Sequence, residues 1–307
     1  MPRLIAKPKY NPFYFGHALT RRHKCILLLG IIAVSTFSCW WIGITERSPS
    51  QPKHHKRTKS EGIFGSPSFR LSHLDYASFW HDVPMKPSTT DPAMIHIITE
   101  IPQTVTAKME VSKQRSHNII AQDMNKDGSP RYHTYGIPFF NYGLIAQTWE
   151  DPNLKSTQGL EGDNDPLDVM ELGSSILKMG SITSCRVLGS LELIDEYEID
   201  HKVLCISIND VHFGQIHTMD DLDRYYPNTL VRLIDWLQRY KTSDGKPENK
   251  LDSEIPKSVE DTLKIIDETH ERWRALCGHD GTPLSSLHLS ASMFWLASPN
   301  CRGEGKI

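Results

Sequence analysis

The stretch Glu161–Gly173, EGDNDPLDVMELG, constrains this chain more than any other, because it places three aspartates, Asp163, Asp165 and Asp168, within six positions. Carboxylates this close together repel one another, and burying them raises the cost further. A folded chain can hold them only beside positive charge or in open water. Three arrangements meet this need: lysine or arginine partners, bound metal ions, or a solvated loop. The stretch alone does not decide between these arrangements.

The ligand types in this stretch narrow the choice of metal. All are carboxylate oxygens without His or Cys, which favours Mg²⁺ or Mn²⁺ over Zn²⁺. Mg²⁺ takes few protein carboxylates and usually bridges to phosphate. The body also contains cationic and phenolic groups of the kind that phosphoryl chemistry uses, namely Lys108, Lys202, Tyr240 and Lys241. On the residues alone, a phosphate-handling metal enzyme and a solvated acidic loop both remain open.

One other segment looks like a metal loop and fails. Asp123–Thr134 has Asp, Asn, Asp and Gly at positions 1, 3, 5 and 6 of an EF-hand, but Thr134 replaces the bidentate Glu and Pro130 occupies position 8. We expect a Gly-containing β-turn there instead. The chain also lacks GxxxxGK[ST], GxSxG and HExxH.

Charge is unevenly divided along the 307 residues. Residues 1–59 hold eleven Lys and Arg and one acid, Glu46, whereas residues 60–307 hold 23 bases and 36 acids, so the head is near +10 and the body near −13. An acidic body argues against nucleic-acid binding, which needs Lys and Arg to neutralise phosphates. The length suffices for one or two domains with a core.

The six cysteines lie at positions 25, 39, 185, 205, 277 and 301 and form no CxxC pair. We interpret them as free thiols rather than a disulfide framework or a zinc site.

Residues 25–44, CILLLGIIAVSTFSCWWIGI, are an uncharged run long enough to span a bilayer as a helix. Trp40 and Trp41 suit a membrane interface, and the basic residues at 21, 22 and 24 would keep the N-terminus on the cytoplasmic or matrix side. A cleaved targeting segment, including a mitochondrial presequence, and an apolar tail docked on the protein are the alternatives. We predict a targeting or transmembrane segment at 1–45, a flexible linker at 46–68 and a folded body at 69–307.

Hydrophobic periodicity places strands and helices in the body. Strands are predicted at 94–101, 105–111, 184–194 and 203–208, and the short connection between the last two indicates a hairpin. In the second strand Lys108 and Glu110 project from one face, and the alternating pattern alone predicts that this face is exposed to solvent. Helices are predicted at 228–241, capped by Asn228, and at 258–277, capped by Ser258. Several strands followed by late helices favour a β-rich barrel or α+β fold.

Five segments in order resemble the soluble family I inorganic pyrophosphatases of eukaryotic type, over roughly residues 79–296. They are HDVP (81–84), EIPQTVTAKMEV (100–111), NYGLIAQTWEDP (141–152), GDNDPLDVMELG (162–173) and WLQRYKTSDGKPEN (236–249). The resemblance implies a five-stranded OB-like barrel with peripheral helices, here preceded by an N-terminal hydrophobic helix. It also implies a homodimer that hydrolyses inorganic diphosphate to two phosphates with several Mg²⁺ ions.

The resemblance also assigns roles residue by residue. Asp165 matches the carboxylate that accepts the proton of the metal-activated water. The family's metal ligands fall on Glu110, Asp163, Asp168, Asp195 and Asp200, with Glu100 at the periphery and Asp165 beside them. The groups that hold the phosphates or complete the pocket fall on Lys108, Arg131, Tyr142, Lys202, Tyr240 and Lys241. Divalent cations among the aspartates would resolve their repulsion.

Two loops depart from the family pattern. Residues 131–141 are about four residues short, so that Pro138 stands where the family has a tyrosine, with Tyr135 as a substitute. In DEYEID, Tyr197 and Ile199 replace a Gly and a Thr. The stretch before His81 is also short. Two hypotheses follow: an active enzyme anchored to a membrane or delivered to a mitochondrion, with the cytoplasm as the family default, or a weakened paralogue kept as a membrane-anchored binding or assembly subunit.

Overall fold

The computed structural model describes residues 57–156, 159–195, 198–279 and 301. The predicted targeting segment and its hydrophobic helix, Cys25 and Cys39, and Tyr197 in the altered loop lie outside these residues. Within them, no helix combines the length and the apolar character needed to cross a membrane.

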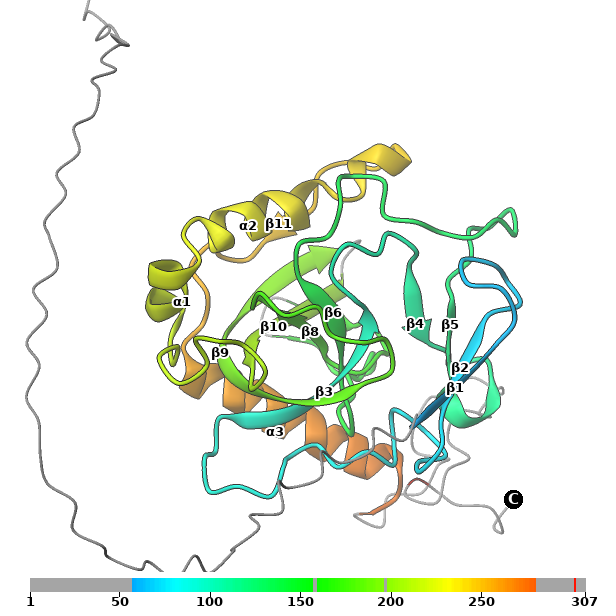
Figure 1. The fold of residues 1–307 in the computed structure, drawn as a ribbon, viewed down its shortest axis with the longest axis horizontal. Coiled ribbons are helices and arrows are strands. Elements are labelled where there is room, and N and C mark those ends of the chain that lie inside the picture. The colour runs from blue at the N-terminus through cyan, green and yellow to red at the C-terminus, as the bar shows by residue number, and fades with distance from the viewer. Residues whose placement is uncertain (1–56, 157–158, 196–197, 280–300, 302–307) are drawn as a thin grey trace, which may run out of the picture. The chain divides into compact units, whose positions relative to one another are not determined.

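Five strands close into the predicted barrel (Figure 1). They are β3 (Met94–Ile101), β6 (Asn141–Ile145), β8 (Asp168–Glu171), β9 (Ile182–Asp195) and β10 (Glu198–Ser207). Hydrogen bonding runs in the order β9-β3-β6-β8-β10, and the pairing of β10 with β9 completes the ring. The pair β9 and β10 is the predicted antiparallel hairpin, whereas β10 and β8 run parallel. Closure leaves no free edge in this ring, which protects a β-rich body from edge pairing.

Two short strands extend the barrel sheet, and a second sheet lies beside it. The extensions are β7 (Glu161–Gly162) and β11 (Lys250–Leu251), and the second sheet has the order β1 (Thr58–Glu61), β2 (Arg70–His73), β5 (Ile120–Gln122) and β4 (Met109–Val111). The end of the predicted linker therefore contains a strand, and strands precede His81. The predicted strand at 105–111 is shortened to β4, although Ala107, Met109 and Val111 are buried as its alternation requires.

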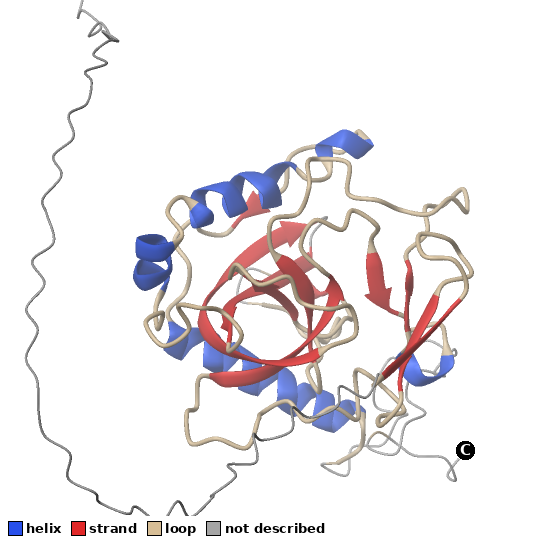
Figure 2. Ribbon diagram, in the orientation of Figure 1, coloured by secondary structure: helices blue, strands red, loops and turns tan. Residues whose placement is uncertain are grey.

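Helices lie around the barrel (Figure 2). They are α1 (Met219–Tyr225), α2 (Thr229–Arg239) and α3 (Val259–Leu276), with 3₁₀ turns η1 (Ser116–Asn118) and η2 (Thr242–Asp244). Ser258 caps α3 as predicted, since its side chain accepts a hydrogen bond from the Asp261 amide. The predicted cap of α2 is wrong: Asn228 has a φ of 65° and makes no side-chain cap bond. Helix α1 was not predicted, and Thr218 and Asp221 form its capping box.

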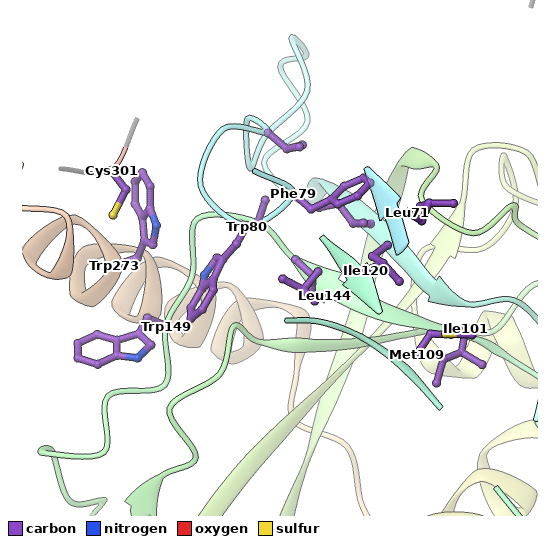
Figure 3. Close-up of a cluster of buried hydrophobic side chains, with 14 of the residues drawn as sticks. Leu71, Phe79, Trp80, Ile101, Met109, Ile120, Leu144, Trp149, Trp273 and Cys301 are labelled. Carbon is purple, nitrogen blue, oxygen red and sulfur yellow. The ribbon is translucent and has the colours of Figure 1, made fainter. Parts of the chain in front are cut away.

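One part of the core joins α3 to the second sheet and the barrel (Figure 3). Trp80, Trp149 and Trp273 pack within it, together with Cys277 and Cys301. These two cysteines form a disulfide, so their interpretation as free thiols is wrong. Cys185 and Cys205 are free and buried, as expected of thiols without a pairing pattern. No CxxC spacing indicates this bond, because the two cysteines are 24 positions apart in the chain.

Candidate active site

A pocket of about 260 Å³ opens where the barrel meets β4. It gathers residues from separated segments: β3, β4, the loop before β6, the aspartate loop before β8, β10 and the end of α2. Twelve of the thirteen predicted site residues line it: Glu100, Lys108, Glu110, Arg131, Tyr142, Asp163, Asp165, Asp168, Asp200, Lys202, Tyr240 and Lys241. The thirteenth, Asp195, ends strand β9, and its side chain lies outside the described structure.

The cationic side of the pocket is organised by Asp123. Its Oδ2 accepts hydrogen bonds from Lys108 Nζ at 2.8 Å and from Arg131 Nη1 at 3.1 Å. Lys108 Nζ also donates to Glu110 at 2.8 Å. Burial lowers the pKa of Lys108, but the charges of Glu110 and Asp123 outweigh it and raise that pKa above its ordinary value. Lys108 is therefore a fixed positive charge, and it is not on a solvated face.

The aspartate loop is held by hydrogen bonds to its own backbone atoms. Asp165 N donates to Asp163 Oδ1 at 2.9 Å, and Asp165 O accepts from Glu150 N at 2.9 Å. The Asp165 side chain is 43% exposed and pairs with Lys113 Nζ at 2.7 Å. Asp165 thus presents its carboxylate to the open part of the pocket, which is where a proton acceptor for water would be needed.

Lys202 connects the anionic residues at the back of the pocket. This lysine is buried on β10, and its Nζ contacts carboxylate oxygens of both Asp168 and Asp200. It also donates to the Tyr142 hydroxyl at 3.1 Å, and that hydroxyl donates in turn to Asp168. Burial opposes the charge on Lys202, but the two aspartates raise its pKa well above its ordinary value. Parallel pairing places Lys202 opposite Asp168, so the barrel register itself sets this contact.

Several carboxylates are held in surroundings that penalise their charge. Burial, and next to it the charge of Asp168, raises the pKa of Glu100 well above its usual range. Burial together with neighbouring carboxylates raises the pKa of Asp163 in the same direction. Burial also raises the pKa of Asp200, whose Oδ1 has no hydrogen-bond partner among the described residues. Divalent cations would offset both the cost of burying these charges and the repulsion between the carboxylates, so the residues present fit a hard metal ion.

The tyrosines divide between the pocket and its surroundings. Tyr240 lines the pocket and stacks on Trp236, with ring centroids 4.7 Å apart. Tyr135 does not line it, because its hydroxyl donates to Asp235 on α2 at 3.0 Å. Tyr135 therefore does not replace the missing family tyrosine at Pro138. The Gly-containing turn expected at 123–134 is present, with Gly128 N donating to Asn125 O at 2.9 Å.

Sequence reasoning missed three residues of this region: Lys113, Asp123 and Glu150. Lys113 lies two positions after the β4 alternation, and Asp123 was considered only as the start of a calcium loop. Glu150 stands inside the family-like segment NYGLIAQTWEDP, but away from the clustered aspartates. For Glu150 the one available signal was its position in a recognised segment, and such a position does not reveal which side chains approach the aspartate loop.

Comparison with known proteins places this geometry in a family. Residues 97–274 match the family model for inorganic pyrophosphatase. The chain belongs to this family. It is 38% identical over 227 residues to the chloroplastic soluble inorganic pyrophosphatase 6 of Arabidopsis thaliana, covering 72% of this chain and 74% of the relative. It is 34% identical over 285 residues to the mitochondrial inorganic pyrophosphatase 2 of Mus musculus, covering 83% and 86%.

A solved structure agrees with this assignment. The inorganic pyrophosphatase of Schistosoma japonicum superposes with a TM-score of 0.67 at 36% identity, covering 71% of this chain and 80% of that one. The expected activity follows from the family: the chain is an inorganic diphosphatase, which hydrolyses diphosphate to two phosphates.

Proposed function

We propose that the pocket performs this hydrolysis with Mg²⁺ and that the sequence-assigned residues carry it out. The carboxylates that would hold the ions are Glu110, Asp163, Asp168, Asp195 and Asp200, with Glu100 at the periphery. Bound Mg²⁺ supplies charge neutralisation for the phosphates and lowers the pKa of water near them. The observation that carries the proposal is the meeting of these carboxylates, apart from Asp195, and the cationic residues in a single pocket.

The protein's own groups would supply binding and proton transfer. Asp165 accepts the proton of the attacking water, since its carboxylate is 43% exposed and lies in the open part of the pocket. Lys108 and Arg131, fixed by Asp123, neutralise one phosphate. The remaining phosphate-side donors are Tyr142, Lys202, Tyr240 and Lys241.

The test compares wild type with Asp165→Asn in the full chain, measuring phosphate released from diphosphate with Mg²⁺ and with chelator. Loss of a general base should lower kcat by about 10² to 10⁴-fold with folding retained. The matched control is Asp127→Asn, because Asp127 lies on an exposed turn and its side chain bonds to Ser129 alone among the described residues. A wild-type rate in Asp165→Asn contradicts the assigned role. A folded wild type that binds Mg²⁺ without turnover favours the weakened binding paralogue.

We also propose that the chain is a homodimer delivered to a membrane or a mitochondrion by residues 1–45. The similarity to a mitochondrial relative and the apolar run at 25–44 support this location. Disulfides persist in oxidising compartments, so the Cys277–Cys301 bond favours a location of the body outside the reducing cytosol. Fractionation of the full chain with thiol labelling of Cys277, and sedimentation of the purified protein, test these points.

A further inference from the structure

Glu150 lies behind the aspartate loop and holds its backbone from both sides. Its N–H donates to Asp165 O at 2.9 Å, and its carbonyl accepts from Asn164 N, also at 2.9 Å. A Cβ added to Gly162 would lie 2.6 Å from the Glu150 carbonyl, so the two backbones touch without a side chain between them. The position of Glu150 relative to the loop is therefore fixed.

The side chain of Glu150 uses only one of its two oxygens. Its Oε1 lies 2.6 Å from His201 Nδ1 and also accepts from the His201 backbone amide at 3.3 Å. Its Oε2 is buried and has no hydrogen-bond partner in the described part of the chain. The residue as a whole is 1% exposed, so open water does not solvate the second oxygen.

Two further carboxylates meet Glu150 at this point. One oxygen from each of Glu150, Asp163 and Asp200 lies within 4.8 Å of the others. Asp200 Oδ1 is a second buried oxygen without a described partner. The nearby cations are engaged elsewhere, because His201 contacts Glu150 Oε1 and Lys202 contacts Asp200 Oδ2. Buried carboxylate oxygens with neither a donor nor a counter-ion between them are costly, so the group is incomplete as a purely structural cluster.

A single hard cation would complete this group. Mg²⁺ binds oxygens at about 2.0–2.1 Å in an octahedron, so opposite ligands on one ion are about 4.2 Å apart. A limit of 4.8 Å between the three oxygens is compatible with such an ion after small side-chain adjustments, or with one of its water ligands between.

We propose that Glu150 binds Mg²⁺ together with Asp163 and Asp200, through its Oε2 directly or through a water in the ion's shell. This inference rests on the proposed metal dependence and adds one residue that the clustered aspartates did not reveal. His201 then orients Glu150, since it fixes the other oxygen and leaves Oε2 for the ion.

Glu192 provides the matched control. Its Oε1 lies 3.3 Å from His201 Nε2 and 3.2 Å from Lys257 Nζ, so it contacts the opposite side of the same histidine. Neither glutamate lines the 260 Å³ pocket, but Glu192 lies outside the three-carboxylate group to which Glu150 belongs. Glu150→Gln and Glu192→Gln therefore remove the same charge from two sides of one imidazole, and only the first faces the metal group.

The experiment measures Mn²⁺ binding to the full chain without diphosphate, by the electron paramagnetic resonance signal of free Mn²⁺. We expect Glu150→Gln to weaken binding about 10 to 100-fold, the usual cost of losing such a metal-supporting group. Glu192→Gln should stay within about threefold of wild type on the same scale. Equal Mn²⁺ affinity in Glu150→Gln and wild type overturns the proposal, as does an equal loss in both variants.

Two additional measurements keep the outcomes separable. If Glu150→Gln folds poorly, His201→Gln is compared with the double variant Glu150→Gln/His201→Gln, in which two neutral amides replace the charged pair. Weaker Mn²⁺ binding in the double variant than in His201→Gln supports the proposal. Equal Mn²⁺ binding in the two variants overturns it. Diphosphate hydrolysis is measured in parallel. A wild type that hydrolyses and binds Mn²⁺, beside an unaffected Glu150→Gln, overturns only the role of Glu150. A folded wild type that does neither overturns the proposed metal dependence itself.

Discussion

Breaking the Cys277–Cys301 disulfide should lower the free energy of unfolding without changing the site. The bond joins residues separated by 24 positions. For a loop of that size the chain-entropy model gives about 3.5 kcal/mol of stabilisation at 25 °C. At about 2–4 °C per kcal/mol for a domain of this size, the melting temperature should fall by about 7–14 °C.

The cleanest perturbation is reductant on the wild-type chain, because it changes no side-chain volume. Cys277 is buried beside Trp273, so a Ser substitution would add an uncompensated hydroxyl to the lost bond. Thermal unfolding is followed by circular dichroism with and without reductant, and alkylation with mass spectrometry confirms that Cys277 and Cys301 become labelled. The control is Cys277→Ala/Cys301→Ala, which should melt at one temperature in both conditions.

A reductant-induced shift below about 2 °C would refute the reasoning, since it would mean that the loop entropy is not restored on reduction. An equal shift in the double alanine variant would also refute it, because the effect would then come from elsewhere. Cys185 and Cys205 cannot account for such a shift through a disulfide, since both are free in the folded chain.

Two other perturbations test the charge arrangement. Asp123→Asn should raise KM for diphosphate about tenfold or more, with a smaller change in kcat. The reason is that it weakens charge-assisted bonds of about 1.5–3 kcal/mol to Lys108 and Arg131. Steady-state kinetics, with Asp127→Asn as the control, test this prediction, and an unchanged KM contradicts it. Burial first, and then the charges of Lys108 and Arg131, lower the pKa of His133 to about 4. An unfolded histidine has a pKa near 6.5, so between about pH 6.5 and 4 the unfolded chain binds a proton that the folded chain does not, and stability falls as pH falls. Urea unfolding across this window should show a shallower pH slope in His133→Gln, and parallel slopes would exclude His133 as the cause.

Three of the five barrel strands could be predicted because they carry their own signals, whereas β6 and β8 were not predicted from the pattern. Apolar runs at 94–101, 184–194 and 203–208 became β3, β9 and β10 with end shifts of at most five residues. The short β7 and β11 have two residues each, and a two-residue strand leaves no periodicity to detect. Asn228 shows a different limit: its residue type suits an N-cap, but its backbone is left-handed and its side chain makes no cap hydrogen bond. Local chemistry predicts such a cap only when the backbone entering the helix is extended.

The site was predictable where charge is concentrated in sequence and unpredictable where the fold concentrates it. Asp163, Asp165 and Asp168 stand together in the chain, so their repulsion is visible before folding. Glu150 joins them only because the backbone turns back on itself at Gly162. Asp123 joins Lys108 and Arg131 only because β4 and β5 pair and bring the next loop alongside.

Charge balance in the pocket explains how it folds with so many acids. Its described lining contains six carboxylates, Glu100, Glu110, Asp163, Asp165, Asp168 and Asp200, and five cations, Lys108, Lys113, Arg131, Lys202 and Lys241. Lysines contact carboxylates assigned to the metal ions, as Lys202 does with Asp168 and Asp200 and Lys108 with Glu110. A cation that binds such a carboxylate competes with the lysine for the same oxygen lone pairs. The released ammonium then has capacity for a phosphate oxygen, so metal and diphosphate binding should reinforce each other in this pocket.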